Sequence, residues 1–317
     1  MSIDQEACLF SGTSHPTLAK LVASHNKMKL GQAKIEPFPD GEIFVQIQEN
    51  VRGRVAFVIQ SLAHRPNYYL MELLIMIDAL KRASAKSIVV LVPYYAYSRQ
   101  DRKDRGRVPI TAKLVANLLE EAGANRVLTM DLHADQIQGF FDIPSDNLHA
   151  RPALVQKIKS LDINLDNTVV AAPDIGSIKL VKALADQLHT DFVIIDKKRL
   201  DSEHVEHSPI IGDVNQKNVI FVDDMCSTAV TLCRAAEACK KAGARKVYAA
   251  ITHGLFVGDA LDRIEKSQLE KVLVSNTIPI DSSKTSSKIE EVSIAHLFGE
   301  GIRCVLYKNS MSSLFTP

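Results

Sequence analysis

The sequence has no surplus of one charge, and this excludes several classes of partner. Its 38 Lys and Arg residues are balanced by 37 Asp and Glu residues, which gives a formal net charge of +1. Proteins that coat nucleic acid or bind anionic membranes normally carry a larger basic excess. We therefore expect no nucleic-acid partner and no membrane association, and bound anions must be held by local clusters of charge.

Cysteine is scarce, and its spacing argues against two kinds of site. The five cysteines are an odd number, and no two of them form a CxxC pair. This pattern is unlike a disulfide framework and unlike a zinc site. The first residues, Met1–Glu6, are polar and acidic, without the basic and apolar regions of a signal peptide. These features predict a cytoplasmic protein.

Long hydrophobic runs are also missing. The longest, near residues 70–80, is interrupted by Glu72 and Asp78, so it is too short and too charged to span a bilayer. Its apolar residues lie on nearly all sides of a helix. This distribution fits either a helix in the protein core or a helix at a subunit interface, and the sequence leaves both open.

The 317 residues contain a repeated rhythm of strands and helices. Short β-branched runs alternate with helical patterns, and the rhythm starts again after about residue 150. Near-continuous apolar strands with helical crossovers are typical of parallel sheets covered on both faces. The predicted strands are 54–60, 87–92, 126–131, 168–172, 192–196, 219–223, 247–252 and 272–275. The predicted helices are 70–82, 110–122, 178–188, 231–242 and 259–266. We read 144–147 as a loop before a domain boundary, and 281–288 as a surface loop.

The sharpest local pattern is the segment 219–231. An apolar run ends in two adjacent carboxylates, and a short turn with hydroxyl side chains then opens a helix. Ligands of open α/β sheets bind at the carboxyl ends of strands, and the N–H groups of a helix N-terminus attract phosphate. Carboxylates accept hydrogen bonds from sugar hydroxyls. The pattern predicts a ribose phosphate site; the alternative is a capped helix after a strand. The predicted binding residues are Asp223, Asp224, Ser227, Thr228, Ala229, Val230 and Thr231.

This segment resembles the ribose 5-phosphate motif of the phosphoribosyl diphosphate (PRPP) fold, which many phosphoribosyltransferases share. Other segments are more specific, namely Leu70–Leu80, Tyr97–Lys103, Lys113–Asn117 and Thr129–Pro144. They resemble the ribose-phosphate diphosphokinases (PRPP synthetases) of the common bacterial and animal class. The resemblance extends over nearly the whole chain, from about residue 10 to residue 315. A phosphoribosyltransferase would leave the predicted ATP loop unexplained.

The resemblance implies a fold, a reaction and partners. It implies two Rossmann-like α/β domains of the PRPP type with mainly parallel sheets, at 1–149 and 150–304, with the tail 305–317 returning to the first. The implied reaction converts ATP and ribose 5-phosphate to PRPP and AMP for nucleotide biosynthesis, with Mg²⁺ as cofactor. A homo-oligomer of dimers assembling to a hexamer is expected, with inorganic phosphate and ADP as regulators.

The resemblance also implies roles for residues in ATP binding and phosphoryl chemistry. For ATP these are Phe38, Asp40, Gly41, Glu42, Arg99, Gln100, Asp101 and His133. From the residues alone, 38–42 reads equally as a hairpin turn and 98–107 as a solvated charged loop. Lys197 and Arg199 match the catalytic loop, where fixed positive charge stabilises a shifting diphosphate. The cluster reads otherwise as a solubilising loop.

Metal and regulatory residues complete the expected site. By resemblance, His133 and Asp174 bind Mg²⁺, although His133 could instead donate a hydrogen bond to a phosphate oxygen. Further acidic candidates, given lower weight, are Asp131, Asp142 and Asp146. The regulatory residues implied are Arg52, Ser84, Arg107, Ser310, Ser312 and Phe315.

Two phosphate loops depart from the family pattern. Ala229 and Val230 stand where the family usually has Gly or small residues, and Ser227 stands where Asp is common. In the diphosphate loop, Ser177 replaces a Gly and Leu180 replaces an Arg. These changes predict a loss of loop flexibility and charge. They leave open a second hypothesis, a catalytically impaired paralogue that acts as a regulatory subunit of an active synthetase.

Overall fold

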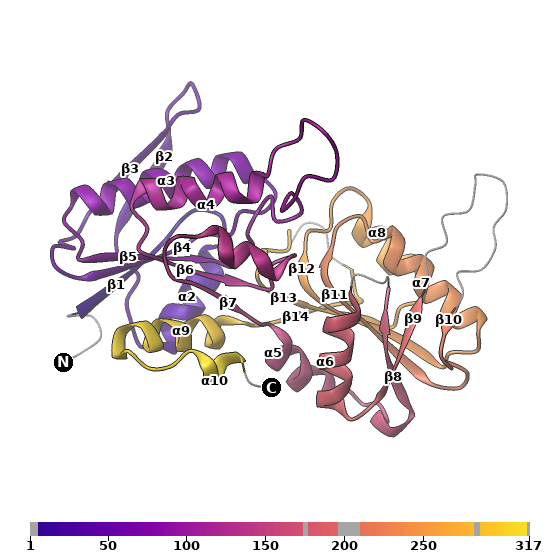
Figure 1. Ribbon diagram of the computed structural model, residues 1–317. Coiled ribbons are helices and arrows are strands. Elements are labelled where there is room, and N and C mark those ends of the chain that lie inside the picture. Colours follow the sequence, from indigo (N-terminus) through magenta and orange to yellow (C-terminus); the bar gives the residue numbers. More distant parts are fainter. Residues whose placement is uncertain (1–5, 174–176, 196–209, 282–285, 316–317) are drawn as a thin grey trace. The chain divides into compact units, whose positions relative to one another are not determined.

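The computed structural model describes residues 6–173, 177–195, 210–281 and 286–315 (Figure 1). The chain divides into two compact units. The N-terminal unit comprises Met1–His149, Thr277–Pro279 and Ile294–Thr316, and the C-terminal unit comprises Ala150–Asn276 and Ile280–Ser293. Each unit is built on its own sheet.

The N-terminal unit contains a five-stranded sheet in the order β1-β4-β5-β6-β7, in which every neighbouring pair is parallel. Its strands are β1 (Ala7–Ser11), β4 (Val55–Ile59), β5 (Ser87–Val92), β6 (Arg126–Met130) and β7 (Ser145–Leu148). A separate antiparallel hairpin consists of β2 (Ala33–Pro37) and β3 (Ile43–Ile47). The central strands are buried and apolar, as parallel strands covered on both faces must be.

Helices cover both faces of this sheet. Figure 1 shows α3 (Pro66–Arg82) and α4 (Thr111–Ala122) on one face, and α2 (Pro16–His25) and α9 (Ala295–Tyr307) on the other. A short 3-10 helix, Asp135–Phe140, precedes β7, and the short helix α10 (Ser312–Phe315) follows α9. The segment that returns to this unit begins at Ile294, earlier than the predicted 305, because the whole of α9 packs against α2.

The helix α3 buries only one of its faces. Leu73, Met76, Ile77 and Leu80 are buried, whereas the side chain of Met71 is 52% exposed. The core interpretation therefore holds for one face of α3. The interface interpretation for the other face stays a prediction.

The C-terminal unit contains a seven-stranded sheet in the order β10-β9-β8-β11-β12-β13-β14. Its strands are β8 (Thr168–Ala172), β9 (Asp191–Ile195), β10 (Ile210–Ile211), β11 (Asn218–Cys226), β12 (Lys246–Gly254), β13 (Lys271–Ser275) and β14 (Ile289–Val292). All neighbouring pairs are parallel except β10 with β9. The predicted α/β class with mainly parallel sheets is confirmed.

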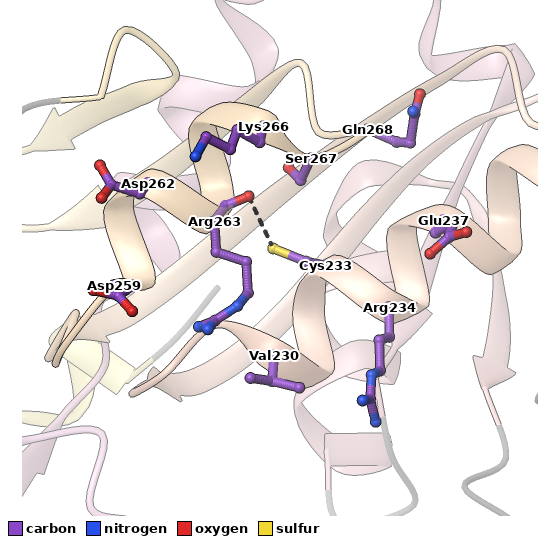
Figure 2. Close-up of a pocket in the computed structure, with 10 residues that line it drawn as sticks. All are labelled: Val230, Cys233, Arg234, Glu237, Asp259, Asp262, Arg263, Lys266, Ser267 and Gln268. Carbon is purple, nitrogen blue, oxygen red and sulfur yellow. Dashed lines mark hydrogen bonds between the residues drawn. The ribbon is translucent and has the colours of Figure 1, made fainter.

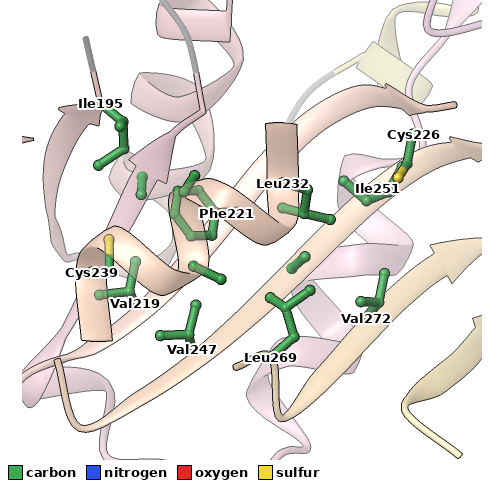
Figure 3. Close-up of a cluster of buried hydrophobic side chains, with 14 of the residues drawn as sticks. Ile195, Val219, Phe221, Cys226, Leu232, Cys239, Val247, Ile251, Leu269 and Val272 are labelled. Atoms are coloured by element: carbon green, nitrogen blue, oxygen red, sulfur yellow. The ribbon is translucent and has the colours of Figure 1, made fainter. Parts of the chain in front are cut away.

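The helices of this unit are α5 (Arg151–Lys159), α6 (Ile178–Leu188), α7 (Val230–Lys241) and α8 (Ala260–Lys266), besides a 3-10 turn at Leu165–Asn167. The core between α7 and the sheet is formed by Phe221 and Val219 of β11, Leu232 and Cys239 of α7, and neighbouring aliphatic side chains (Figure 3). This packing fixes the position of α7 relative to β11, and so the geometry of the turn that joins them.

One segment predicted as a loop is a strand. Residues 145–148 form β7, whose Ser145 pairs with Val127 of β6. The segment is polar because β7 is an edge strand, and Asp146 forms an ion pair with Arg126 at its start. Hydrophobic periodicity does not reveal such a strand.

All five cysteines are free thiols. In the parts of the chain that the structure describes, no helix is both long and apolar enough to cross a bilayer.

Candidate active site

The paired carboxylates lie within a strand rather than at its end. The strand β11 extends to Cys226, beyond the predicted end at Asp223, because β12 is equally long and continues to pair with it. Asp223 lies opposite Ile251, and Cys226 lies opposite Gly254. The extra length holds both carboxylates on regular backbone, so their positions are set by the sheet.

Asp223 is anchored by two donors on one oxygen. Its Oδ1 accepts a hydrogen bond from the hydroxyl of Ser177 at 2.9 Å and one from the backbone N–H of Asp224 at 3.0 Å. Ser177 is 8% exposed and lies just before α6. The residue that departs from the family pattern thus contacts a predicted ribose-binding carboxylate.

The loop after β11 is held through its carbonyl groups. The Ser227 carbonyl accepts from the N–H of Val257 at 3.0 Å, and the Thr228 carbonyl accepts from the guanidinium of Arg263. In a planar trans peptide, the C=O and the following N–H point in opposite directions. The N–H of Thr228 therefore points away from Val257, whereas the N–H of Ala229 points away from Arg263 and faces the thiol of Cys226.

Ala229 has an unusual backbone conformation in this loop. It caps α7 in the left-handed region, with φ 58° and ψ 5°, where glycine is preferred. Val230 is the first residue of α7, and its φ is not positive. Among the residues of this turn, the positive φ is thus confined to Ala229.

We expect Ala229→Gly to raise the free energy of unfolding by about 1 kcal/mol, because a left-handed non-glycine residue costs about that much. The matched variant Val230→Gly is expected to lower it by about 0.5–1 kcal/mol, because glycine is unfavourable in a helix. Urea unfolding of both variants measures this difference. Equal effects of the two substitutions would contradict the assignment of strain to Ala229.

A neighbouring cavity of about 840 Å³ lies on the α7–α8 side of this loop (Figure 2). It shares only Val230 with the predicted ribose phosphate site. Its charged side chains comprise both signs, which indicates no ligand class: Arg234, Glu237, Asp259, Asp262, Arg263 and Lys266. The thiol of Cys233 on its wall contacts the Arg263 carbonyl at 3.8 Å.

Burial raises the pKa of the nearby Cys226 to about 12, so that thiol is not a nucleophile near neutral pH.

The predicted adenine loop is the tip of the β2–β3 hairpin. Gly41 adopts φ 96°, and the N–H of Glu42 donates to the Asp40 carboxylate at 3.2 Å. The ring of Phe38 is 47% exposed and packs edge-on against Phe44, with ring centroids 5.9 Å apart. The hairpin alternative is therefore correct as a description of the backbone. The exposed ring of Phe38, close in sequence to two carboxylates, is compatible with adenine binding, which stays a prediction.

The cationic segment after β5 is tied to the start of α4. The backbone N–H of Ala112 donates to the Gln100 carbonyl at 3.2 Å, and the hydroxyl of Thr111 donates to the Gln100 side chain. Asp101 accepts from the Gln136 amide at 2.8 Å. Arg99 is exposed in the same segment. Local hydrogen bonds thus order a loop whose cations face solvent.

The metal candidates lie at opposite ends of the strands of the N-terminal sheet. Asp131 and the exposed His133 follow β6 at its carboxyl end, where His149 Nδ1 lies 2.8 Å from Asp131 Oδ1. Asp146 forms an ion pair with Arg126 at the amino ends of β7 and β6, and Asp142 lies just before β7. Parallel strands have all their carboxyl ends on one side of the sheet. Asp131 lies on that side, whereas Asp142 and Asp146 lie at the amino ends of the strands, so the structure does not bring them to Asp131.

Within the described ranges, no group of three His, Cys, Asp or Glu residues is arranged to hold a metal ion. Asp174 and the catalytic candidates Lys197 and Arg199 lie outside the described residues. Their roles stay predictions from the sequence.

The regulatory candidates form two local groups in the N-terminal unit. Arg52 lies in an isolated antiparallel bridge with Ala85, so it is next to Ser84, whose φ is 65°. The hydroxyl of Ser310 donates to that of Ser312 at 2.9 Å beyond α9. Arg107, with φ 63°, lies in the cationic segment instead, and the side chain of Phe315 is outside the described set. No ligand role is tested by these placements.

Three contacts at the site were not predicted from the sequence. They are the Ser177 bond to Asp223, the Arg263 bond to the Thr228 carbonyl, and the His149 bond to Asp131. The partners in each pair are separated by at least 18 residues, so no local motif joins them. Asp131 and Asp223 end predicted strands, and no signal in the sequence marked Ser177, Arg263 or His149 as contact residues.

Comparison with known proteins agrees with these features along the chain. Residues 7–123 match the model of the N-terminal domain of ribose phosphate pyrophosphokinase, and residues 205–316 match that of the phosphoribosyl synthetase-associated domain. A ribose-phosphate pyrophosphokinase of Chlorobaculum tepidum is 52% identical over 97% of this chain and 94% of its own. One from Wolinella succinogenes is 51% identical over 97% of this chain and 98% of its own.

A solved structure shares both the fold and the sequence. The crystal structure of phosphoribosylpyrophosphate synthetase from Mycobacterium smegmatis matches with a TM-score of 0.90 and 41% identity, covering 96% of this chain and 99% of that one. Identity at this level over nearly the full length of each chain, together with the strand-borne carboxylate pair and its phosphate-type loop, places this chain in the ribose-phosphate pyrophosphokinase (PRPP synthetase) family.

Proposed function

We propose that this chain transfers the diphosphoryl group of ATP to the C1 hydroxyl of ribose 5-phosphate, which gives PRPP and AMP for nucleotide biosynthesis. The observation that carries the proposal is the β11–α7 segment, where two carboxylates on a strand precede a hydroxyl-rich turn that opens a helix. Near-complete coverage of relatives named for this activity supports it.

In this proposal, the C-terminal unit binds ribose 5-phosphate. Asp223 and Asp224 accept hydrogen bonds from the ribose hydroxyls. The segment Ser227–Thr231 binds the 5-phosphate through backbone N–H groups at the start of α7 and through its hydroxyl side chains. The Arg263 and Val257 contacts behind the loop hold those N–H groups in place before the ligand arrives.

The N-terminal unit binds ATP. The exposed Phe38 ring stacks on adenine, and the Asp40 and Glu42 carboxylates accept from its amino group. Arg99 contacts the triphosphate as a planar cation suited to phosphate oxygens, and Gln100 and Asp101 order its loop.

The chemical step is an in-line displacement at phosphorus. The C1 hydroxyl oxygen of the ribose forms a bond to the β-phosphorus of ATP, and the bond from that phosphorus to the α–β bridging oxygen breaks. AMP leaves with the bridging oxygen, and the hydroxyl proton is released. Lys197 and Arg199 stabilise the negative charge that shifts between the phosphates, and neither has to act as a base.

We further propose Mg²⁺ as the cofactor, held by His133 and Asp174. Mg²⁺ in nucleotide sites keeps several waters and uses one or two protein ligands besides phosphate oxygens, so these two side chains are enough to hold this ion. When bound, it neutralises phosphate charge. Asp131, tied to His149, is better suited to orient this segment than to bind metal directly.

The same proposal includes a cytoplasmic location and a homo-oligomer. It also includes regulation by inorganic phosphate and ADP, which would act through Arg52, Ser84, Arg107 and the segment Ser310–Phe315. The second hypothesis, an impaired regulatory subunit, has no support in the comparisons. The α7 cap that prompted it is formed, with its strain confined to one residue.

A coupled assay of AMP release tests the proposal. Purified protein with ATP and Mg²⁺ should release AMP only when ribose 5-phosphate is added, and ribose without the phosphate should not replace it. Release of ADP instead of AMP, or AMP release that does not depend on ribose 5-phosphate, would contradict the proposed reaction.

A further inference from the structure

The serine that replaces a family glycine in the diphosphate loop has a contact that glycine could not make. The hydroxyl of Ser177 donates to Asp223 Oδ1 at 2.9 Å, although the two residues are 46 positions apart. Ser177 is 8% exposed, so the bond is shielded from competing water. From the sequence alone, this replacement reads only as a loss of flexibility.

Helix capping does not account for a serine at this position. Ser177 is the N-cap residue of α6, where serine is common because its hydroxyl oxygen accepts from the first helical turn. Its side chain makes no such capping bond to α6. The hydroxyl hydrogen is directed to the carboxylate on β11 instead.

The bond restricts the carboxylate at the place where orientation matters. Asp223 Oδ1 also accepts from the N–H of Asp224 at 3.0 Å, so two donors on different elements fix one oxygen. A carboxylate fixed in this way is held in one orientation. Because less side-chain motion is lost on binding, the ligand binds more tightly.

We infer that Ser177 is a positioning residue for ribose 5-phosphate, acting through the orientation of the Asp223 carboxylate. The inference rests on the proposed function, since it takes Asp223 as the group that binds the ribose hydroxyls. It predicts a result opposite to the one suggested by family resemblance: restoring glycine at position 177 should weaken the binding of ribose 5-phosphate.

Calorimetric titration of the full-length protein with ribose 5-phosphate tests this inference. We expect Ser177→Ala and Ser177→Gly to raise the Kd about tenfold, which corresponds to about 1.4 kcal/mol. Ser177→Thr keeps the hydroxyl and should stay close to the parent. The Kd for ATP should be unchanged in all three. Ser160→Ala is the matched control, because Ser160 also lies at a helix end but its hydroxyl donates to the Lys157 carbonyl.

A double-mutant cycle separates positioning from a general structural effect. If Ser177 acts through Asp223, Ser177→Ala should change the Kd less than about twofold in an Asp223→Ala background, because coupled residues are not additive. An equal tenfold effect in both backgrounds would overturn the inference. Thermal unfolding of each variant checks that the fold is kept.

The outcomes distinguish this inference from the proposed function. If the parent binds ribose 5-phosphate and makes PRPP, but Ser177→Ala and Ser177→Gly bind as well as the parent, the inference is wrong and the proposed function stands. If the parent does not bind ribose 5-phosphate, both are wrong.

Discussion

Replacing Lys197 by alanine is expected to lower kcat by about 10²–10³-fold while changing KM for ATP and ribose 5-phosphate little. Lys197 begins a cationic run, Lys197–Arg199, which follows β9 after one aspartate. A fixed cation that meets charge developing in the transition state contributes about 2.7–4 kcal/mol to lowering the barrier. Because this stabilisation applies to the transition state, its loss appears in kcat.

The neighbouring Lys198 provides the control for this prediction. The resemblance assigns catalytic roles to Lys197 and Arg199 and none to Lys198, so Lys198→Ala should change kcat by no more than about twofold. Steady-state kinetics with each substrate varied in turn measure both effects. A Lys197→Ala enzyme with the kcat of the parent would remove Lys197 from the mechanism.

The second large effect is expected from Asp223→Asn, which should weaken ribose 5-phosphate binding by about 10–100-fold. Hydrogen bonds to a charged group contribute about 1.5–3 kcal/mol each, and the amide keeps the shape of the side chain while losing its charge. The Kd for ATP should stay nearly unchanged, because the ATP residues belong to the other compact unit. Calorimetry with each ligand measures the split.

Asp213→Asn is the matched control for that substitution. Asp213 lies in the same unit and pairs with Lys217 at 3.7 Å, but its side chain is 68% exposed, and it precedes the start of β11 whereas Asp223 lies toward the other end of that strand. Its removal should leave both affinities as in the parent. Equal losses of ATP and ribose 5-phosphate affinity in Asp223→Asn would indicate a folding defect in place of a lost ligand contact.

The parallel strands could be predicted because their burial on both faces leaves a continuous apolar run. The prediction for β5 matched the structure at both ends, and β8 did the same. The edge strand β7 could not be found in this way, because Ser145 and Asp146 are polar. The extension of β11 to Cys226 was also missed, since the length of a strand depends on its partner β12 as well as on its own residues.

The site was predicted as a set of residues but not as a set of contacts. The carboxylate pair and the hydroxyl-rich turn are local, so the spacing of 219–231 indicated them. Ser177 was read as a defect because its partner, Asp223, is distant in sequence and close only in the fold. The residue of this turn that adopts a positive φ could not be predicted, because the sequence does not show where α7 begins; the structure assigns it to Ala229.

The most direct test of the central claim is to follow the phosphates of ATP through the reaction. With ATP labelled at the γ-phosphate in one experiment and at the α-phosphate in another, the protein is incubated with ribose 5-phosphate and Mg²⁺, and the products are separated. The proposed diphosphoryl transfer predicts that the γ label appears in PRPP and the α label appears in AMP. Recovery of the γ label as inorganic phosphate, or in a sugar bisphosphate that has gained a single phosphoryl group, with the α label in ADP, would contradict it.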